Sequence, residues 1–212
     1  MKTQAKIDLY KLHKADYVTP RKPILVNIKE ATYLAISGQG EPGGEVFTEK
    51  IGALYGVAFT IKMTRKFAGQ QDYAVGKLEG QWWSEKAQEN FSRTPKDQWR
   101  WKLLIRTPDF VTQDELARAV ETLLKRGKTQ PVREVRLESL AEGHCVQMFH
   151  VGPYERERET IALMEANAEK NGLQFHGRHH EIYLSDPRRV PAERLKTILR
   201  QPVKKIGAAH GP

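Results

Sequence analysis

The segment KLLIRTP, residues 102–108, has a near copy in KTILRQP, residues 196–202. The two segments agree at their lysine, arginine and proline and carry aliphatic residues between them. Aliphatic runs of this length that stop at a proline are typical of strands. A strand motif that occurs once in each half of a chain indicates an internal duplication.

The segments that precede each copy support this interpretation, because they are predicted to follow the same order. In the first half, residues 24–37 predict a strand or strand pair, residues 45–63 a helix, residues 77–84 a strand and residues 99–108 another strand. In the second half, residues 145–155 predict a strand and turn, residues 159–172 a helix ended by Gly172, and residues 179–186 and 195–203 two strands. The sequence therefore predicts an α+β fold of tandem duplicated β-α-β-β modules.

The remaining segments complete the expected domain organisation. Residues 1–23 are expected to be a partly ordered lead-in, and residues 24–212 one domain with repeats at about 24–110 and 132–205. A helix at 112–127 joins the repeats, with Thr112 and Glu115 in capping-box spacing and Gly127 at its end. Residues 85–98 are expected to be a polar hairpin, and Val132 is expected to begin a strand that ends at Leu140.

Composition excludes several classes of protein. The 212 residues are 39% apolar and contain a single cysteine, Cys145, so the chain can build a core but no intrachain disulfide. No long apolar run or signal peptide is visible, and we expect a cytoplasmic protein without a membrane partner. The formal charge of +9 suits a nucleic-acid binder, but Lys and Arg are dispersed along the chain, which favours an ordinary basic surface.

Alternation within KLEGQWWS, residues 77–84, places an acid and a tryptophan together. Glu79 and Trp83 share one face of the predicted strand, and Trp82 lies on the other, although a bulge at Gly80 would reverse the tryptophans. In HHEIYLSD, residues 179–186, the same rule puts His179, Glu181 and Tyr183 on one face. Aligning the third elements of the two repeats matches Glu79 with Glu181. If the repeats pack with pseudo-twofold symmetry, both glutamates are expected to face a central ligand cleft. A solvent-exposed sheet face is the alternative for both glutamates.

Other motifs are set aside. The glycines of GQGEPGG, residues 38–44, match a dinucleotide fingerprint, but the neighbouring glutamates would repel a pyrophosphate. His176, His179 and His180 have the spacing of metal ligands on a helix, but here they lie on a loop and a strand. His150 is expected to be half-buried at the border of the cleft. We therefore expect neither a metal nor a cofactor.

The ordered combination of these segments resembles the GyrI-like small-molecule-binding family. The resemblance covers about residues 23–203 and is carried by KPILVNIKEATYLAISGQG, EKIGALYGVAFTIKM, KLEGQWW and HHEIYLSDPRRVPAERLKTILRQPV. It implies a duplicated strand-helix-strand-strand fold of SHS2-type modules with a ligand cleft. The fold is similar to that of effector-binding domains in multidrug-responsive regulators, in which an acid among aromatic residues receives hydrophobic cations.

Stand-alone members of the family include hydrolases that detoxify cyclopropanoid, DNA-alkylating genotoxins by adding water. The resemblance implies that Glu181 activates or orients the water, with Glu155 as a second carboxylate. Either Tyr183 or Tyr55 is expected to hydrogen-bond the dienone oxygen of the substrate as negative charge develops on it. The expected ligand-binding residues are Glu79, Trp82, Trp83, Tyr55, Phe149, Tyr154 and His150.

Two other functions remain open at this stage. The first is a non-catalytic sensor or sequestering protein for hydrophobic cationic drugs, since an acid in an aromatic pocket serves either use. The second is a DNA-associated inhibitor, suggested by the basic charge. An enzyme turns over many equivalents of substrate, and a binder saturates at one equivalent. A DNA-bound protein shows a steep salt dependence of binding.

Overall fold

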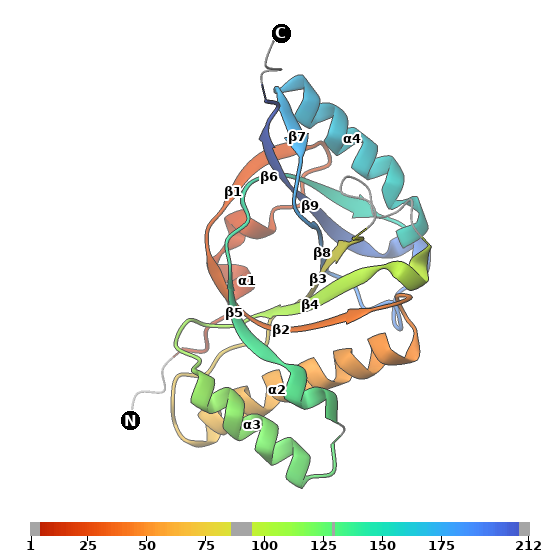
Figure 1. The fold of residues 1–212 in the computed structure, drawn as a ribbon. Helices are drawn as coiled ribbons and strands as arrows, with labels where there is room; N and C mark the ends of the chain where they lie inside the picture. The colour runs from red at the N-terminus through yellow and green to blue at the C-terminus, as the bar shows by residue number, and fades with distance from the viewer. Residues whose placement is uncertain (1–4, 86–94, 129, 208–212) are drawn as a thin grey trace. The chain divides into compact units, whose positions relative to one another are not determined.

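The computed structural model describes residues 5–85, 95–128 and 130–207 of the chain (Figure 1). These residues form helices and antiparallel strands, which confirms the predicted α+β class. They divide into two compact units: residues 5–14 with 30–141, and residues 15–29 with 142–207. None of the described helices is long and apolar enough to span a membrane.

In the part of the first unit that the structure describes, strands pair in the order β3-β4-β2-β5. Its strands are β2 (Ala31–Gln39), β3 (Leu78–Trp83), β4 (Arg100–Arg106) and β5 (Arg136–Leu140), and its helices are α1 (Leu9–Leu12), α2 (Glu45–Phe67) and α3 (Gln113–Lys125). Short 3-10 helices span Lys96–Gln98 and Gln130–Glu134. The predicted capping box of α3 is confirmed, because Thr112 accepts a bond from the Glu115 backbone while the Glu115 side chain bonds the Thr112 backbone.

Helix α2 covers one face of this sheet, which we call the helix face of the first unit (Figure 1). Phe47 of α2 stacks on Trp82 of β3 and meets Trp101 of β4 edge-on. Trp101 is fully buried, and a Cβ atom at Gly38 would lie only 2.2 Å from its ring. Glycine at position 38 therefore lets a tryptophan lie flat across the neighbouring strand.

The second unit contains strands in the order β1-β6-β9-β8, with β7 also paired to β9. These strands are β1 (Ile24–Ile28), β6 (Gly143–Val151), β7 (Leu173–Phe175), β8 (His179–Tyr183) and β9 (Lys196–Lys205). Its helix is α4 (Glu157–Lys170), and 3-10 helices span Tyr154–Arg156 and Ala192–Arg194. A further 3-10 helix spans Lys14–Tyr17.

Helix α4 covers the helix face of the second unit. An apolar cluster fills this face, consisting of Val146, Met148, Met164, Ala168, Leu173, Leu199 and Val203. The opposite face carries a charged network around Arg200, which is 1% exposed. Arg200 donates to Glu142 at 2.7 Å and to Gln147 at 2.8 Å, and His180 lies 2.8 Å from the other Glu142 oxygen.

Residues 15–23, the second part of the segment predicted to be a partly ordered lead-in, are built into the second unit. Arg200 donates to the carbonyl of Asp16 and Gln147 to that of Val18, while the backbone of Phe149 donates to Pro20. These three hydrogen bonds anchor the residues that precede β1. No sequence pattern indicates these contacts, because the acceptors are backbone carbonyls.

The two units share the connection order strand, helix, strand, strand. In the first unit β2 pairs with β4 and β4 with β3, and in the second β6 pairs with β9 and β9 with β8. This common order supports the predicted duplication. The pseudo-twofold symmetry and the central cleft stay predictions.

Strand registers correct one predicted correspondence. When KLLIRTP and KTILRQP are superposed, Ile105 matches Leu199. Ile105 is opposite Leu78, whereas Leu199 is opposite Glu181. Glu181 therefore corresponds to Leu78, and the predicted equivalence of Glu79 with Glu181 is wrong by one residue.

Several element boundaries also differ from the predictions. Residues 130–134 form a 3-10 helix, so strand β5 begins at Arg136 and not at Val132. Helix α4 begins at Glu157, two residues earlier than expected, and the three-residue strand β7 was not predicted. Most of the hairpin expected at 85–98 lies outside the described residues.

Candidate functional site

Three polar side chains of strand β8 lie on the helix face of the second unit. Glu181 is opposite Leu199, which belongs to the apolar cluster beneath α4. Because side chains alternate along a strand, His179 and Tyr183 share the face of Glu181. His180 and Ile182 take the other face, as the sequence predicted.

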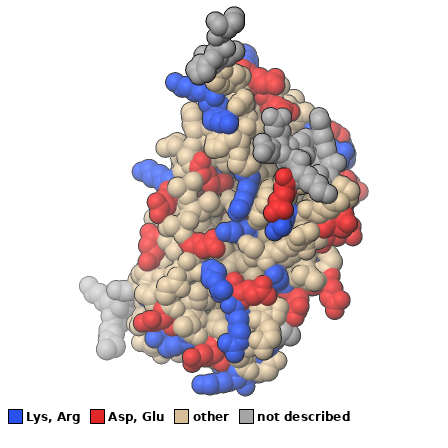
Figure 2. All heavy atoms as spheres, in the orientation of Figure 1, with Lys and Arg blue, Asp and Glu red and all other residues tan. Residues whose placement is uncertain are grey.

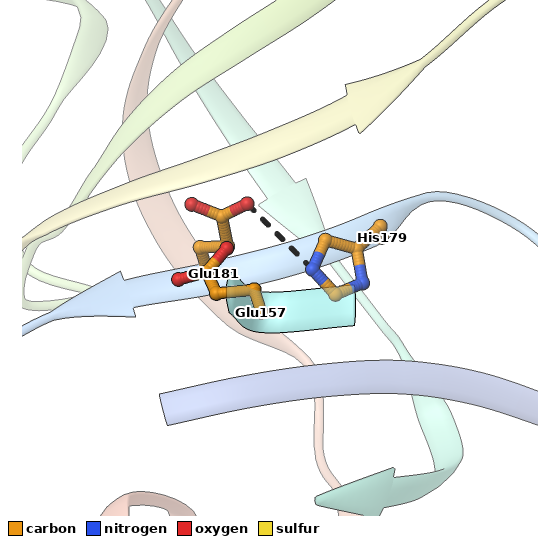
Figure 3. Close-up of side chains that lie close together, drawn as sticks. All are labelled: Glu157, His179 and Glu181. Atoms are coloured by element: carbon orange, nitrogen blue, oxygen red, sulfur yellow. Dashed lines mark ion pairs between the residues drawn. The ribbon is translucent and has the colours of Figure 1, made fainter. Parts of the chain in front are cut away.

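Glu157, the first residue of α4, joins this group from the helix (Figure 3). Nε2 of His179 lies 3.6 Å from Oε1 of Glu181, and one ligand atom of each of the three residues lies within 4.8 Å of the others. Their exposed fractions are 6% for Glu157, 4% for His179 and 7% for Glu181. We call these three residues the Glu-His-Glu cluster.

The two carboxyl groups of the cluster are electrostatically coupled. Burial, and then the negative charge of Glu181, raises the pKa of Glu157 well above its ordinary value. Glu157 and Glu181 also hydrogen-bond each other. The protonated form of Glu157 therefore persists to a higher pH than that of an exposed glutamate.

The histidine of the cluster is held in its neutral form. Burial lowers the pKa of His179 to about 4, although a hydrogen bond that the ring donates to the Gln201 side chain opposes the shift. A neutral imidazole has a lone pair on one ring nitrogen, which can accept a proton or bind a metal. Together the three side chains are a possible donor set for a metal ion.

Two tyrosines border the cluster. The rings of Tyr154 and Tyr183 meet edge-on, with centroids 6.0 Å apart. Burial, followed by the charge of Glu181, raises the pKa of Tyr154 to about 12 and raises the pKa of Tyr183 well above its ordinary value. Both hydroxyls therefore keep their protons at neutral pH, and Tyr183 hydrogen-bonds Glu181.

Three predicted residues of the second unit lie away from the cluster or have other contacts. Glu155 is exposed, so Glu157 is the carboxyl group that lies beside Glu181. Phe149 lies on the face opposite α4, because it alternates with Met148 of the apolar cluster. His150 faces α4, but its ring nitrogens contact the Thr160 hydroxyl at 2.9 Å and the Pro153 carbonyl at 3.2 Å.

Residues predicted in the first unit fall on two different faces of its sheet. Trp82 lies on the helix face, under Phe47, and Tyr55 is on α2 itself, where it stacks on Phe59. Glu79 and Trp83 take the opposite face, and Glu79 is 1% exposed. The alternation within residues 77–84 is therefore confirmed, and the bulge at Gly80 is absent from the described pairing.

Glu157 was missed in the sequence, although its position carried a signal. Residues Glu157, Ile161, Met164 and Ala168 recur at helical spacing, and the last three pack into the apolar cluster. A glutamate on the buried stripe of a helix is rare unless it is paired. This feature marks Glu157 once the helix is known to begin two residues earlier.

Charge on the visible surface is mixed. Over the face drawn in Figure 2, Lys and Arg side chains are interspersed with Asp and Glu. A cavity of about 180 Å³ in the first unit is lined by Gln39, Ser84, Glu85, Gln98 and Arg100. It includes no residue of the Glu-His-Glu cluster.

Comparison with known proteins gives a consistent result. Residues 21–204 match the GyrI-like small-molecule-binding domain. The crystal structure of a conserved protein from Listeria innocua is 40% identical, with a TM-score of 0.87, and the match covers 94% of this chain and 100% of that one. A hydrolase from Listeria innocua is 39% identical over the same shares of the two chains, with a TM-score of 0.84.

The fold also extends to more distant proteins. The C-terminal domain of EcmrR shares 12% identity with a TM-score of 0.56, over 87% of this chain and 98% of that domain. Curated proteins give no match. On the strength of the domain match and of the similar Listeria innocua proteins, the chain belongs to the GyrI-like small-molecule-binding family.

Proposed function

We propose that this protein hydrolyses a cyclopropanoid genotoxin by carboxylate-assisted addition of water. The observation that carries the proposal is the pair of buried carboxyl groups, Glu157 and Glu181, bordered by the hydroxyls of Tyr154 and Tyr183. The hydrolase from Listeria innocua, at 39% identity, supports an enzymatic role.

The proposed reaction adds one water across a strained carbon–carbon bond. Glu181 accepts a proton as the water oxygen bonds to a cyclopropane carbon. The ring bond breaks, and its electron pair moves through the conjugated dienone to the carbonyl oxygen. A tyrosine hydroxyl stabilises the charge developing on that oxygen, which takes up a proton to become a phenol. Water is the only co-reactant consumed.

Each of the neighbouring residues has a defined part in this reaction. Glu157 lies beside Glu181 and orients the same water, in place of the exposed Glu155 that the sequence suggested. Tyr183 is on the strand of Glu181, and Tyr154 meets it edge-on, so either ring can lie against a flat ligand. Trp83 and Glu79 remain proposed ligand contacts, while Trp82 has a packing role under α2.

The experiment mixes a catalytic amount of protein with a duocarmycin-type cyclopropanoid and follows ring opening by mass spectrometry. We expect many turnovers that each add one water, with the rate reduced roughly 100-fold or more in Glu181→Gln. Glu155→Gln is the matched control, because it removes an exposed carboxylate close to the site and is expected to keep full activity. Full activity in a folded Glu181→Gln protein would refute the proposed reaction.

The second candidate function is sequestration of a hydrophobic cationic drug. The buried carboxyl pair favours it, since a carboxylate in a buried aromatic setting attracts a cation. In this case the same mixture shows binding that saturates at one equivalent and no product. Loss of this binding in Glu181→Gln would then identify Glu181 as the counter-charge.

A further inference from the structure

The Glu-His-Glu cluster has a second chemical property, which depends on its geometry alone. Glu157 approaches from the first turn of α4, and His179 and Glu181 approach from one face of β8 (Figure 3). Residues two apart on a strand point the same way, so the pattern His-x-Glu delivers a nitrogen and an oxygen to one point. The helix brings the third donor to that point.

The separations suit a small cation. Bonds of about 2.0–2.1 Å from zinc to nitrogen and oxygen place tetrahedral ligand atoms about 3.4 Å apart. Nε2 of His179 and Oε1 of Glu181 are 3.6 Å apart, and all three ligand atoms fall within 4.8 Å.

A buried oxygen of Glu157 supplies an independent observation. Oε1 of Glu157 makes no hydrogen bond to any residue that the structure describes, although the side chain is 6% exposed. Leaving a buried carboxyl oxygen without a partner is unfavourable. A cation held by the cluster provides that partner.

The surroundings also hold the ligands in place. The side chain of Gln201 hydrogen-bonds the His179 ring, and the Gln201 amide donates to the His176 carbonyl at 2.7 Å. Tyr183 hydrogen-bonds Glu181. Histidine and carboxylate ligands of metals are commonly oriented by such outer hydrogen bonds.

We infer that Glu157, His179 and Glu181 bind one divalent transition-metal ion of the zinc class. Two carboxylate oxygens and one imidazole nitrogen suit such ions better than calcium or magnesium, which prefer oxygen ligands alone. Three protein ligands leave one position open to water. This inference goes beyond the proposed function and does not depend on it.

The first test titrates untagged, chelator-treated protein with Co²⁺ and follows its visible absorption, and then repeats the titration with Zn²⁺ in a calorimeter. We expect saturation at one equivalent and displacement of Co²⁺ by Zn²⁺. His179→Gln is expected to weaken binding at least tenfold. His176→Gln is the matched control, because this histidine is exposed on the same segment, and its affinity is expected to be unchanged.

A second test uses the unaltered protein, in case His179→Gln does not fold. In protein labelled with ¹⁵N-histidine, one equivalent of Zn²⁺ is expected to shift the ring nitrogen signals of His179 and to leave those of the exposed His144 and His176 unchanged. Absence of saturable binding at one equivalent, or a shift confined to the exposed histidines, would overturn the inference. Both readouts are independent of hydrolysis, so a failure of the proposed reaction leaves them intact.

Discussion

The two units bury different kinds of side chain at corresponding positions of their sheets. Leu78 of β3 and Glu181 of β8 occupy matching register positions on the helix face of their sheets. Beneath α2 this face is filled by Phe47, Trp82 and Trp101, whereas beneath the start of α4 it carries the Glu-His-Glu cluster. Two units with the same connection order can thus differ, one using this face for packing and the other for ionisable groups.

On the faces opposite the helices, each unit carries an ion pair, and the two pairs differ in burial. In the first unit Lys102 pairs with Glu138, and both side chains are partly exposed. In the second unit Arg200 pairs with Glu142, and both side chains are almost completely buried. An ion pair costs most to break where water cannot replace the lost partner.

The sharpest test of this contrast is to remove the acid from each pair. We expect Glu142→Ala to lower the free energy of unfolding by about 3–5 kcal/mol, because Arg200 is left buried without its counter-charge. Glu138→Ala is the matched change and is expected to cost less than about 1 kcal/mol. Urea unfolding measures both values, and equal losses would contradict the contrast.

The aromatic side of the comparison is tested at two neighbouring tryptophans. Trp82→Ala removes a ring packed under Phe47 and is expected to cost about 3 kcal/mol or more in unfolding free energy. Trp83→Ala alters the opposite, partly exposed face and is expected to cost less than half as much. If urea unfolding shows the larger loss at Trp83, the assignment of Trp82 to packing is wrong.

The buried pair of the second unit also predicts a pH dependence of stability. Burial acts to raise the pKa of Glu142, but the charges and hydrogen bonds of His180 and Arg200 outweigh it and lower the pKa from 4.5 to about 2. Between these values the unfolded chain binds more protons than the folded one, so stability rises with pH. We expect a loss of up to about 3 kcal/mol as pH falls from 4.5 toward 2.

Unfolding free energies measured by urea at several pH values check this prediction. In Glu142→Gln the slope over the same window is expected to be clearly smaller, because the titrating group is gone. An unchanged slope would assign the acid sensitivity to other carboxylates.

The smallest expected effect concerns the helix starts. Thr112 caps α3 with its side chain, whereas the N-cap of α4, Arg156, makes no side-chain capping bond. Thr112→Ala is expected to lower the unfolding free energy by about 1 kcal/mol. Arg156→Ala is expected to change it by only a few tenths, and a loss as large as that of Thr112→Ala would show that α4 is capped in another way.

Local patterns predicted most of the fold. Alternation and helical spacing located the strands and the long helices, and the Thr112–Glu115 capping box was confirmed. Strand register was harder, since a single-residue shift exchanges the two faces of a strand. This shift explains why Glu79 was matched to Glu181 when its true counterpart is Ile182.

The candidate site was only partly predictable for a related reason. Glu181 and Tyr183 were found by alternation within one strand, but Glu157 comes from a separate helix and depends on where that helix begins. His179 was set aside as a zinc ligand because His176 and His180 do not share its face. The structure pairs His179 with two glutamates, and no spacing between histidines could indicate that arrangement.

The positions of β1 and β5 in the chain have a consequence for synthesis on the ribosome. Strand β1 comes before β2 in the chain but pairs with β6 of the second unit, while β5 comes before β6 but pairs with β2 of the first. The first unit can therefore complete its sheet as soon as residue 141 has emerged. Strand β1 must wait unpaired until residues 143–151 follow, so truncation after the first unit would leave an open strand edge available for aggregation.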